Sequence, residues 1–169
     1  MSEMPRYILR NCTIFVDRES KVGQASEISL PVPEMKVEEL RNAGMVMPIE
    51  VSLGYEKLEN SFKMTAFDPQ TLQLFGLAPG KTKEFMITGH LQDEDGTVHS
   101  AVAYIRGYIK KVDAGSWQPG EKAETEFEVS IRYFKLEIDG RHIIEMDPFE
   151  VSIGGVSQTG AGRAAMLLS

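Results

Sequence analysis

The sequence predicts a mainly β protein, and three features of the chain support this fold class. The chain has 169 residues, which suits one domain with its own core. In residues 58–66, polar side chains alternate with side chains that share the other face, namely Leu58, Asn60, Phe62, Met64 and Ala66. Such period-two alternation is typical of a half-buried strand. Further along, long segments of β type flank two short turn sequences, Asp93-Glu94-Asp95-Gly96 and Asp139-Gly140.

The two turn sequences predict two long hairpins. Residues 83–92 and 98–112 form the arms of the first, and residues 124–138 and 141–146 those of the second. Along residues 124–138 the apolar side chains change faces between Tyr133 and Phe134. Either a bulge there or a strand that passes between two burial environments explains the change. Long strands that change partners suit an assembly better than a small isolated barrel.

One short helix is predicted between the strands. Asp68 is a suitable N-cap, Pro69 fits the first helical position, and Gly76 can terminate the helix. The sequence contains no linker or change of composition, so residues 1–169 are expected to form one domain.

Two segments have no evident role in an isolated domain. Residues 32–48 are bounded by prolines and lack a clean period, and ordered loops of that length are usually functional. Residues 154–169 contain four glycines and then an apolar run, which predicts a loose tail that orders when it docks.

Composition excludes several functional classes. Lys and Arg number 18 against 25 Asp and Glu, so the net charge is −7, which argues against a groove that neutralises nucleic-acid phosphates. Cys12 is the single cysteine, so neither a disulfide framework nor a thiolate metal site is expected. The N-terminal sequence lacks the apolar stretch of a signal peptide, and no run approaches the roughly 20 apolar residues of a membrane span. A soluble protein made in the cytoplasm is expected.

No motif predicts catalysis, a cofactor or a metal ion. Gly80-Lys81-Thr82 lacks the spacing of a phosphate loop and follows a helix instead of a strand. The acidic turn at residues 93–96 lacks the register of a calcium loop, and a solvated hairpin tip is the simpler interpretation. His90 and His99 lie on the two arms of one hairpin, but two imidazoles without a third ligand are weak evidence for zinc. We therefore expect a protein that is not an enzyme.

Two features of the region around residues 113–128 leave alternatives open. Trp117 lies in a turn-rich loop, where it either anchors an interface or covers the molecule's own core. Glu124, Glu126 and Glu128 share one strand face, and a solvated acidic face is the plainest interpretation of it.

The ordered set of residues resembles the major tail tube proteins of contractile-tailed bacteriophages and of the related R-type tailocins. No single motif is diagnostic, and the resemblance extends from about residue 17 to residue 148. It is carried by Leu30-Pro31, Lys36, Glu38, Arg41, Gly44-Met45, Pro48, Gly54, Phe75-Gly76-Leu77, Arg106-Gly107, Val112-Asp113, Gly115, Trp117, Gly120-Glu121-Lys122-Ala123-Glu124, Tyr133, Lys135-Leu136-Glu137, Asp139-Gly140-Arg141, Glu145 and Asp147-Pro148.

The resemblance implies a β-sandwich or barrel with one short flanking helix. It implies hexameric rings whose long hairpins complete an inter-subunit β-barrel, and rings that stack into a tube inside a contractile sheath. The implied location is the virion tail or the tailocin particle, and the implied partners are the sheath, the baseplate or tail terminator, the tape-measure protein and, in a phage, DNA passing through the lumen. Residues 32–48 would be the inter-ring loop, with contacts from Met35, Val37, Leu40, Arg41, Gly44, Met45 and Met47.

Further site expectations follow from the same resemblance. Trp117, Glu121 and Lys122 would anchor an interface, and the face of Glu124, Glu126 and Glu128 would line an acidic lumen that repels DNA phosphates. The family's tails often end in a charged helix-like stretch, whereas Arg163 is the single charge in residues 157–169 here. Two alternatives are a tube of a type VI secretion or other contractile injection system, and a β-barrel binding module or enzyme.

Overall fold

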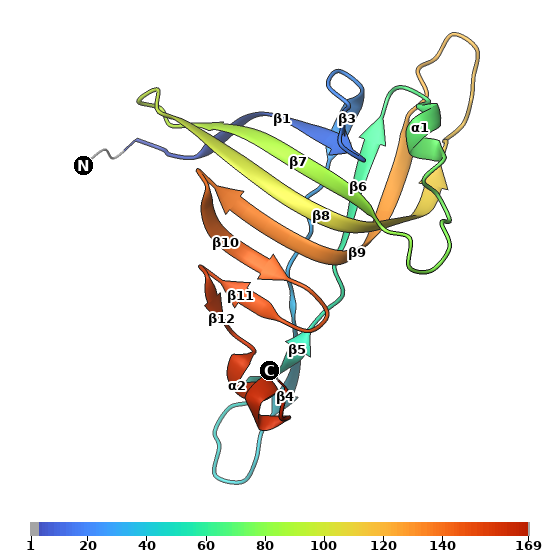
Figure 1. Ribbon diagram of the computed structural model, residues 1–169. Helices are drawn as coiled ribbons and strands as arrows, with labels where there is room; N and C mark the ends of the chain where they lie inside the picture. Colours follow the sequence, from blue (N-terminus) through green and yellow to red (C-terminus); the bar gives the residue numbers. More distant parts are fainter. Residues whose placement is uncertain (1–3, 169) are drawn as a thin grey trace.

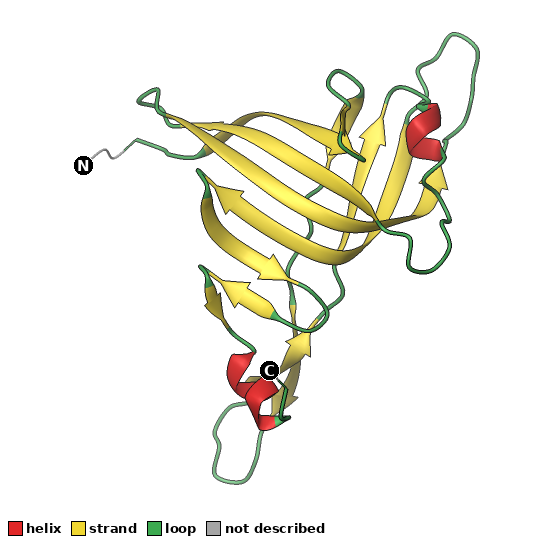
Figure 2. Cartoon of the chain, in the orientation of Figure 1, coloured by secondary structure: helices red, strands yellow, loops and turns green. Residues whose placement is uncertain are grey.

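The computed structural model describes residues 4–168 and is mainly β, as the sequence predicts (Figures 1 and 2). Its elements in chain order are β1 (Ile8–Val16), β2 (Glu19–Ser20), β3 (Ala25–Ile28), β4 (Met35–Leu40), β5 (Ile49–Tyr55), β6 (Glu59–Met64), α1 (Pro69–Leu72), β7 (Lys83–Gln92), β8 (Val98–Asp113), β9 (Thr125–Ile138), β10 (Arg141–Met146), β11 (Val151–Ile153), β12 (Val156–Ser157) and α2 (Gly160–Ala165). No helix among the described residues is long and apolar enough to cross a lipid bilayer.

Most strands belong to one curved antiparallel sheet. Its main path runs β12-β11-β10-β9-β8-β7-β1-β2, and β6 joins it through β9 and carries β3 on its other side. Strands β4 and β5 form a separate two-stranded sheet. Phe62 on β6 and Phe85 on β7 face each other across the interior, with 6.3 Å between ring centroids. The sheet therefore wraps around one core in the manner of a sandwich or barrel.

Both predicted hairpins are confirmed. Strands β7 and β8 pair from Gln92 and Val98 onward across the acidic turn, and β9 and β10 pair across Asp139-Gly140. Asp139 and Gly140 have φ of 52° and 75°, the left-handed conformation that a tight hairpin turn demands.

The change of face along β9 has both of its predicted causes. The pairing with β8 shifts register at Arg132, because Arg106 pairs with Tyr133 and Gly107 pairs with Ile131. On its other edge, β9 pairs with β6 over residues 125–130 and with β10 over residues 134–138. The bulge thus lies where β9 changes its partner from β6 to β10. Phe127 before the bulge and Phe134 after it are both buried, although an odd number of positions separates them.

The core is apolar and lies inside the curved sheet. Stacked rings of Phe62 and Phe127, with centroids 5.0 Å apart, stand at its centre. Its other buried members are Ile14, Val16, Leu58, Met64, Leu74, Phe85, Ile87, Ala103, Ile105, Ile109, Val129, Phe134, Met146 and Val151. They come from nearly every strand of the large sheet, so one contiguous core holds the domain together.

The helix α1 starts at Pro69 as expected, but it ends at Leu72 and is shorter than predicted. Asp68 occupies the N-cap position, although its carboxylate bonds to the side chains of Thr71 and Lys21 instead of to a helix N–H. Lys21 Nζ lies 2.8 Å from Asp68 Oδ2 and donates to Gln70 Oε1 at 2.7 Å. This buried lysine ties the segment after β2 to the helix.

Two segments differ from the sequence expectation. The predicted loop at residues 32–48 contains strand β4, whose pairing with β5 was missed because the mixed charges hide the alternation. The tail at residues 154–169, expected to be loose, contains β12 and the second helix α2 within its described part. Arg163 holds this helix by an ion pair to Glu150, at 3.3 Å, and a bond to the Phe149 carbonyl. Intrachain contacts therefore fix the tail's backbone without a docked partner.

Candidate functional site

The hairpin β4–β5 is a protruding arm (Figures 1 and 2). All six residues of β4 are exposed, and within β5 Val51 alone is half-buried. Its ladder runs between the two strands themselves, from Met35 opposite Tyr55 to Leu40 opposite Ile49. An isolated two-stranded hairpin is marginally stable in water, so this arm is expected to gain its stability from a surface outside the subunit.

The arm is unusually apolar for an exposed element. Its exposed large apolar side chains are Met35, Val37, Leu40, Val46, Met47, Ile49, Leu53 and Tyr55. Val46 near the tip is 92% exposed. In the β4–β5 register Val37 pairs with Ser52 and Leu40 pairs with Ile49, so the arm has exposed apolar side chains on both faces. Exposed apolar surface is typical of interaction sites.

The tip of the arm is ordered by local bonds. Met45 N donates to the Asn42 carbonyl at 3.1 Å, and Arg41 Nε donates to the Met45 carbonyl at 3.2 Å. Gly44 has φ of +88°, so the turn requires glycine there. The residues predicted for the inter-ring contact thus all lie on one arm, and the sequence missed the β5 half. Its period-two pattern, with Ile49, Val51, Leu53 and Tyr55 on one parity, was the available signal.

A second surface is the uncovered face of the large sheet, which carries a cleft of about 610 Å³. Its polar lining residues form contacts with one another. The Arg106 guanidinium lies 5.3 Å from the centre of the Tyr133 ring, and Lys135 Nζ lies 3.1 Å from Glu137 Oε1. Paired charges of this kind give the face little net field.

Tyr133 on this face donates a hydrogen bond to a carboxylate. Its hydroxyl donates to Glu145 Oε2 at 2.9 Å. Burial of the ring, followed by the bond to the Glu145 carboxylate, raises the pKa of Tyr133 to about 12. The group is therefore neutral at every physiological pH, and it positions a carboxylate without carrying charge itself.

A cleft of about 630 Å³ lies at the base of the arm. Tyr55 and Lys57 line it from the β5 side, and Asp147, Phe149 and Glu150 line it from the β10–β11 connection. Phe149 is 75% exposed and was not singled out by the sequence. The arm and the exposed Phe149 thus border one concave surface.

Trp117 is 66% exposed, so it does not cover the core. Its ring meets Phe67 edge-on, with 5.1 Å between centroids, and Phe67 is itself half exposed. Glu121 and Lys122 lie exposed further along the same loop. Trp117 thus packs on another exposed ring, and its role as an interface anchor stays a prediction.

The three predicted lumen glutamates do not form a purely acidic face. Glu126 and Glu128 are half-buried and point away from Phe127, on the other face of β9. Glu124 is exposed just before the strand. Lys122 Nζ lies 3.8 Å from Glu124 Oε1, and Lys111 Nζ lies 3.9 Å from Glu128 Oε1. Lys63 stands directly opposite Glu126 in the β6–β9 register, which adds further positive charge beside the row.

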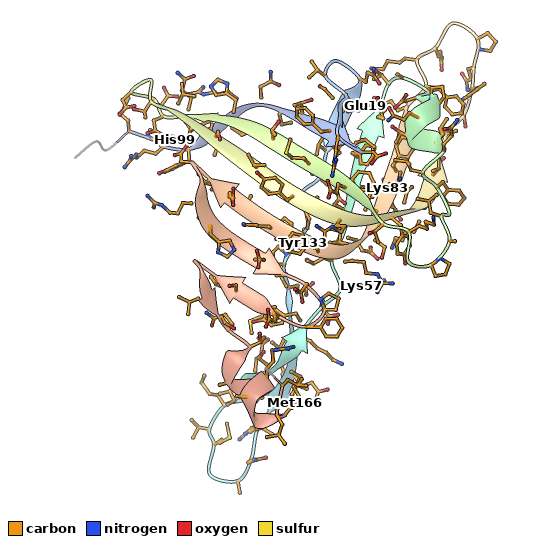
Figure 3. All side chains as sticks on the ribbon, in the orientation of Figure 1. Glu19, Lys57, Lys83, His99, Tyr133 and Met166 are labelled. Carbon is orange, nitrogen blue, oxygen red and sulfur yellow. The ribbon has the colours of Figure 1, made fainter. Side chains whose placement is uncertain are left out.

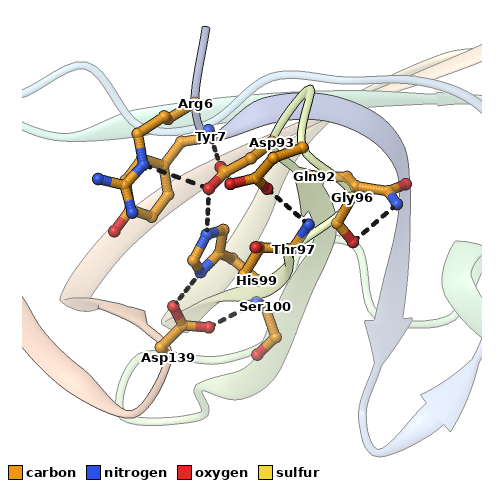
Figure 4. Close-up of polar contacts among 10 residues, drawn as sticks. Arg6, Tyr7, Gln92, Asp93, Gly96, Thr97, His99, Ser100 and Asp139 are labelled. Atoms are coloured by element: carbon orange, nitrogen blue, oxygen red, sulfur yellow. Dashed lines mark hydrogen bonds and ion pairs between the residues drawn. The ribbon is translucent and has the colours of Figure 1, made fainter. Parts of the chain in front are cut away.

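The other candidate sites have structural explanations. Lys81 N donates to the Ala78 carbonyl at 3.0 Å, which makes Gly80-Lys81-Thr82 part of a turn. His90 is exposed, whereas His99 is buried between carboxylates. Within the described residues, no group of three or more His, Cys, Asp or Glu side chains has the arrangement of a metal site. The His99 cluster, visible in Figures 3 and 4, was not expected from the sequence.

Comparisons with known proteins show which family the chain resembles. A family model described as "Phage tail tube protein FII" matches residues 5–166. The tail tube protein of Escherichia phage P2 is 27% identical over 161 residues, which cover 92% of this chain and 93% of that protein. The major tail tube protein of Serratia phage KSP20 is 24% identical over 151 residues, which cover 82% of this chain and 81% of that protein.

A solved structure shares the fold. A chain in the six-fold symmetrised cryo-EM structure of the anti-feeding prophage baseplate matches with a TM-score of 0.52 and 12% identity, over 81% of this chain and 96% of that chain. Tail tube proteins are structural subunits, so this chain is not an enzyme. The match over nearly the whole sequence, together with a β fold that carries a free-standing apolar arm, shows that this chain belongs to the phage tail tube protein FII family, the tube proteins of contractile tails.

Proposed function

We propose that six copies of this protein form a ring and that rings stack helically into the hollow inner tube of a contractile tail. The β4–β5 arm carries this proposal, because its apolar side chains have no surface to cover within the described subunit. In a stack, the arm would lie against the neighbouring ring and remove those side chains from water. Met35, Val37, Leu40 and Met47 would supply the apolar contact, and Arg41, Gly44 and Met45 would shape the tip.

The sheet edges support closure of the ring. The main path ends at β2 on one side and β12 on the other, and open strand edges are templates for pairing with another chain. If neighbouring copies pair these edges around a ring, the backbone N–H and C=O groups of every edge strand gain hydrogen-bond partners. The structurally similar chain comes from a particle with six-fold symmetry, which agrees with six copies.

The tube would lie inside the sheath and end at the baseplate and the tail terminator, with the tape-measure protein and later DNA in its lumen. The protein would be made in the bacterial host cytoplasm and act in the tail of the particle. Trp117, Glu121 and Lys122 would anchor a lateral or sheath contact, because that loop is exposed and its Trp117 ring packs on the exposed ring of Phe67. Glu124, Glu126 and Glu128 remain the predicted lumen face, now with lysines beside them.

A tailocin, a type VI secretion system or another contractile injection system would use the same kind of tube. The anti-feeding prophage likeness is compatible with such a particle. The sequence relatives are proteins of phages P2 and KSP20, and this favours a phage tail over a secretion system.

The proposal is tested by shortening the arm. Replacing residues 41–48 by Asn-Gly closes the Leu40–Ile49 pair with a two-residue turn and removes the tip. The variant should remain folded, because the core receives no residue from this segment. Negative-stain microscopy should then show single rings or free subunits where the natural protein gives stacked tubes.

A matched control changes a loop outside the arm. Replacing Pro79-Gly80 in the turn before β7 by Asn-Gly keeps the turn chemistry and should leave tube formation unchanged. Tubes of normal length from the shortened arm would contradict the inter-ring role. A strict monomer of the natural protein at high concentration would contradict the proposal as a whole.

A further inference from the structure

Three chain segments that are distant in sequence meet around His99, away from the β4–β5 arm (Figures 3 and 4). They are residues 4–7, the β7–β8 turn that contains Asp93, and the β9–β10 turn that contains Asp139. His99 itself lies at the start of β8 and is buried. No assembly role proposed above uses this cluster.

The N-terminal segment is held by the β7–β8 turn through three bonds. Tyr7 N donates to Asp93 Oδ1 at 2.7 Å, and Arg6 Nε donates to Asp93 Oδ2 at 3.2 Å. In return, Glu94 N donates to the Pro5 carbonyl at 3.1 Å. The Asp93 side chain is only 1% exposed. Its hydrogen bonds are therefore strong, and a carboxylate left buried without them would destabilise the fold.

His99 joins this carboxylate to the second turn. Its Nε2 lies 3.1 Å from Asp93 Oδ2, and its Nδ1 lies 2.5 Å from Asp139 Oδ2. Asp139 Oδ1 is occupied by the Ser100 N–H at 2.9 Å. The ring of Tyr7 stacks on the imidazole, with 4.3 Å between centroids, and covers it from the N-terminal side.

The geometry determines the protonation state of the ring. An ionised carboxylate only accepts hydrogen bonds, so both nitrogens of His99 must donate. Neutral imidazole has one N–H, and its other nitrogen would direct a lone pair at a carboxylate oxygen. Only the imidazolium, with two N–H groups, satisfies Asp93 and Asp139 together.

The surrounding charges favour that imidazolium. Bonds to Asp93 and then to Asp139 raise the pKa of His99, and burial lowers it by less. The Tyr7 N–H bond, with His99 and Arg6, keeps the pKa of Asp93 low, and the Ser100 N–H bond does the same for Asp139. The other charged neighbours are less direct. Asp95 interacts electrostatically with Asp93 and Arg6, and Arg141 interacts electrostatically with Asp139. Glu94 pairs with Arg10.

We propose that His99 is a proton-operated clamp that fastens residues 4–7 and the two hairpin turns to one another. The clamp is closed while the ring carries two protons, and it opens when one proton leaves. Because the folded pKa is raised, the stabilisation is complete below the ordinary histidine pKa of about 6.5 and is lost as the pH rises through the folded value. Mildly alkaline conditions therefore weaken the link that His99 makes between Asp93 and Asp139, and this loosens the N-terminal segment while the core stays folded.

Nuclear magnetic resonance of the natural protein tests the clamp directly. His99 should titrate above its ordinary pKa of about 6.5. Amide exchange at Tyr7 and Glu94, corrected for intrinsic rates, should be faster at pH 9 than at pH 6. The increase should be roughly tenfold for each pH unit by which the folded pKa of His99 exceeds its ordinary value. Exchange at Ile87 in the core should not change beyond the correction.

The substitution Asp139→Asn keeps the contact with His99 but removes its need for a second proton on the imidazole ring. Asparagine suits the left-handed φ of 52° at this position and the turn before Gly140. The Ser100 N–H would hold the amide oxygen, so the amide N–H₂ would donate to neutral His99 Nδ1, and Nε2–H would donate to Asp93. The clamp should then stay closed from pH 6 to pH 9, and the pKa of His99 should fall below that in the natural protein.

Three results would each overturn the proposal. One is titration of His99 at or below the ordinary pKa. Another is equal corrected exchange at Tyr7 and Glu94 at both pH values in the natural protein. The third is an Asp139→Asn variant whose N-terminal exchange still depends on pH as in the natural protein. Tube formation is not the readout, so these outcomes are independent of the proposed function.

Discussion

At the residue scale, the bulge in the β8–β9 ladder depends on one glycine. Gly107 lies where the register shifts, and a Cβ built on it would be 2.1 Å from the Ser130 carbonyl oxygen. A backbone atom of a paired strand cannot move aside as a flexible side chain can. Gly107 therefore allows the two longest strands to approach closely at the point where β9 changes its partner.

Gly107→Ala should destabilise the fold by about 3 kcal/mol or more, because the added methyl must displace the β9 backbone. Gly89→Ala is the matched control, since its Cβ would meet Leu9 and Ala101 side chains at ordinary distances of 3.5 and 3.6 Å. Urea unfolding followed by the fluorescence of Trp117 measures both. Equal midpoints for the two variants would contradict this role for Gly107.

At the element scale, a buried ion pair fixes the position of the helix α1. It has four residues, too few to be stable alone, and the Lys21–Asp68 contact secures it. The two side chains are 6% and 13% exposed, so the surrounding protein strengthens their attraction. The helix therefore acts as a cover whose position depends on one charged contact.

Asp68→Asn should lower the free energy of unfolding by about 3 kcal/mol at pH 7, because it leaves the Lys21 ammonium buried without a countercharge. Burial raises the pKa of Asp68, but bonds from Lys21 and Thr71 outweigh it and leave the pKa below its ordinary value. The stabilisation is thus present above the ordinary pKa of about 3.9 and is lost as the pH falls through the lower folded value.

Urea unfolding at pH 7 and again near pH 3 checks this prediction, and the difference between the natural protein and the variant should shrink in acid. Glu84→Gln is the control, because the Arg18–Glu84 pair is exposed and should contribute well under about 1 kcal/mol. A variant as stable as the natural protein at pH 7 would show that the Lys21–Asp68 contact does not hold the helix.

At the scale of the whole molecule, apolar attraction and charge repulsion oppose each other between copies. Each chain carries a net charge of −7, whereas the arm presents apolar side chains. Repulsion between exposed charges is screened over about 8 Å at physiological ionic strength, and apolar contact is not weakened by salt. The balance between copies therefore shifts with ionic strength.

Tube growth should accelerate when sodium chloride rises from roughly 20 mM to 150 mM, because screening reduces the repulsion between acidic copies. Light scattering of the purified protein measures the growth. Arg18→Gln, at an exposed side chain outside the arm, raises the net negative charge by one unit and should increase the salt dependence. Growth that slows with salt would mean that ion pairs, and not apolar contacts, dominate the inter-copy surface.

The sequence by itself determined the elements whose pattern is local. Alternation in residues 58–66 and the turns at residues 93–96 and 139–140 were read correctly, because side-chain parity and turn chemistry need no distant partner. Residues 32–48 were recognised as a segment without an evident place in the core, but strand β4 was hidden by mixed charges on exposed positions, and strand β5 was missed. The tail helix was missed because Arg163 is held by the distant Glu150.

Only the tertiary structure decided which groups meet. His99 and Asp139 are 40 positions apart and Arg6 and Asp93 are 87 apart, and no spacing rule connects them. The lysine beside Glu128 likewise became evident only when β8 and β9 were paired, because Lys111 lies on the neighbouring strand. Periodicity records which face a side chain takes, whereas the ion pairs depend on the register between strands, and that register is set by packing of the whole core.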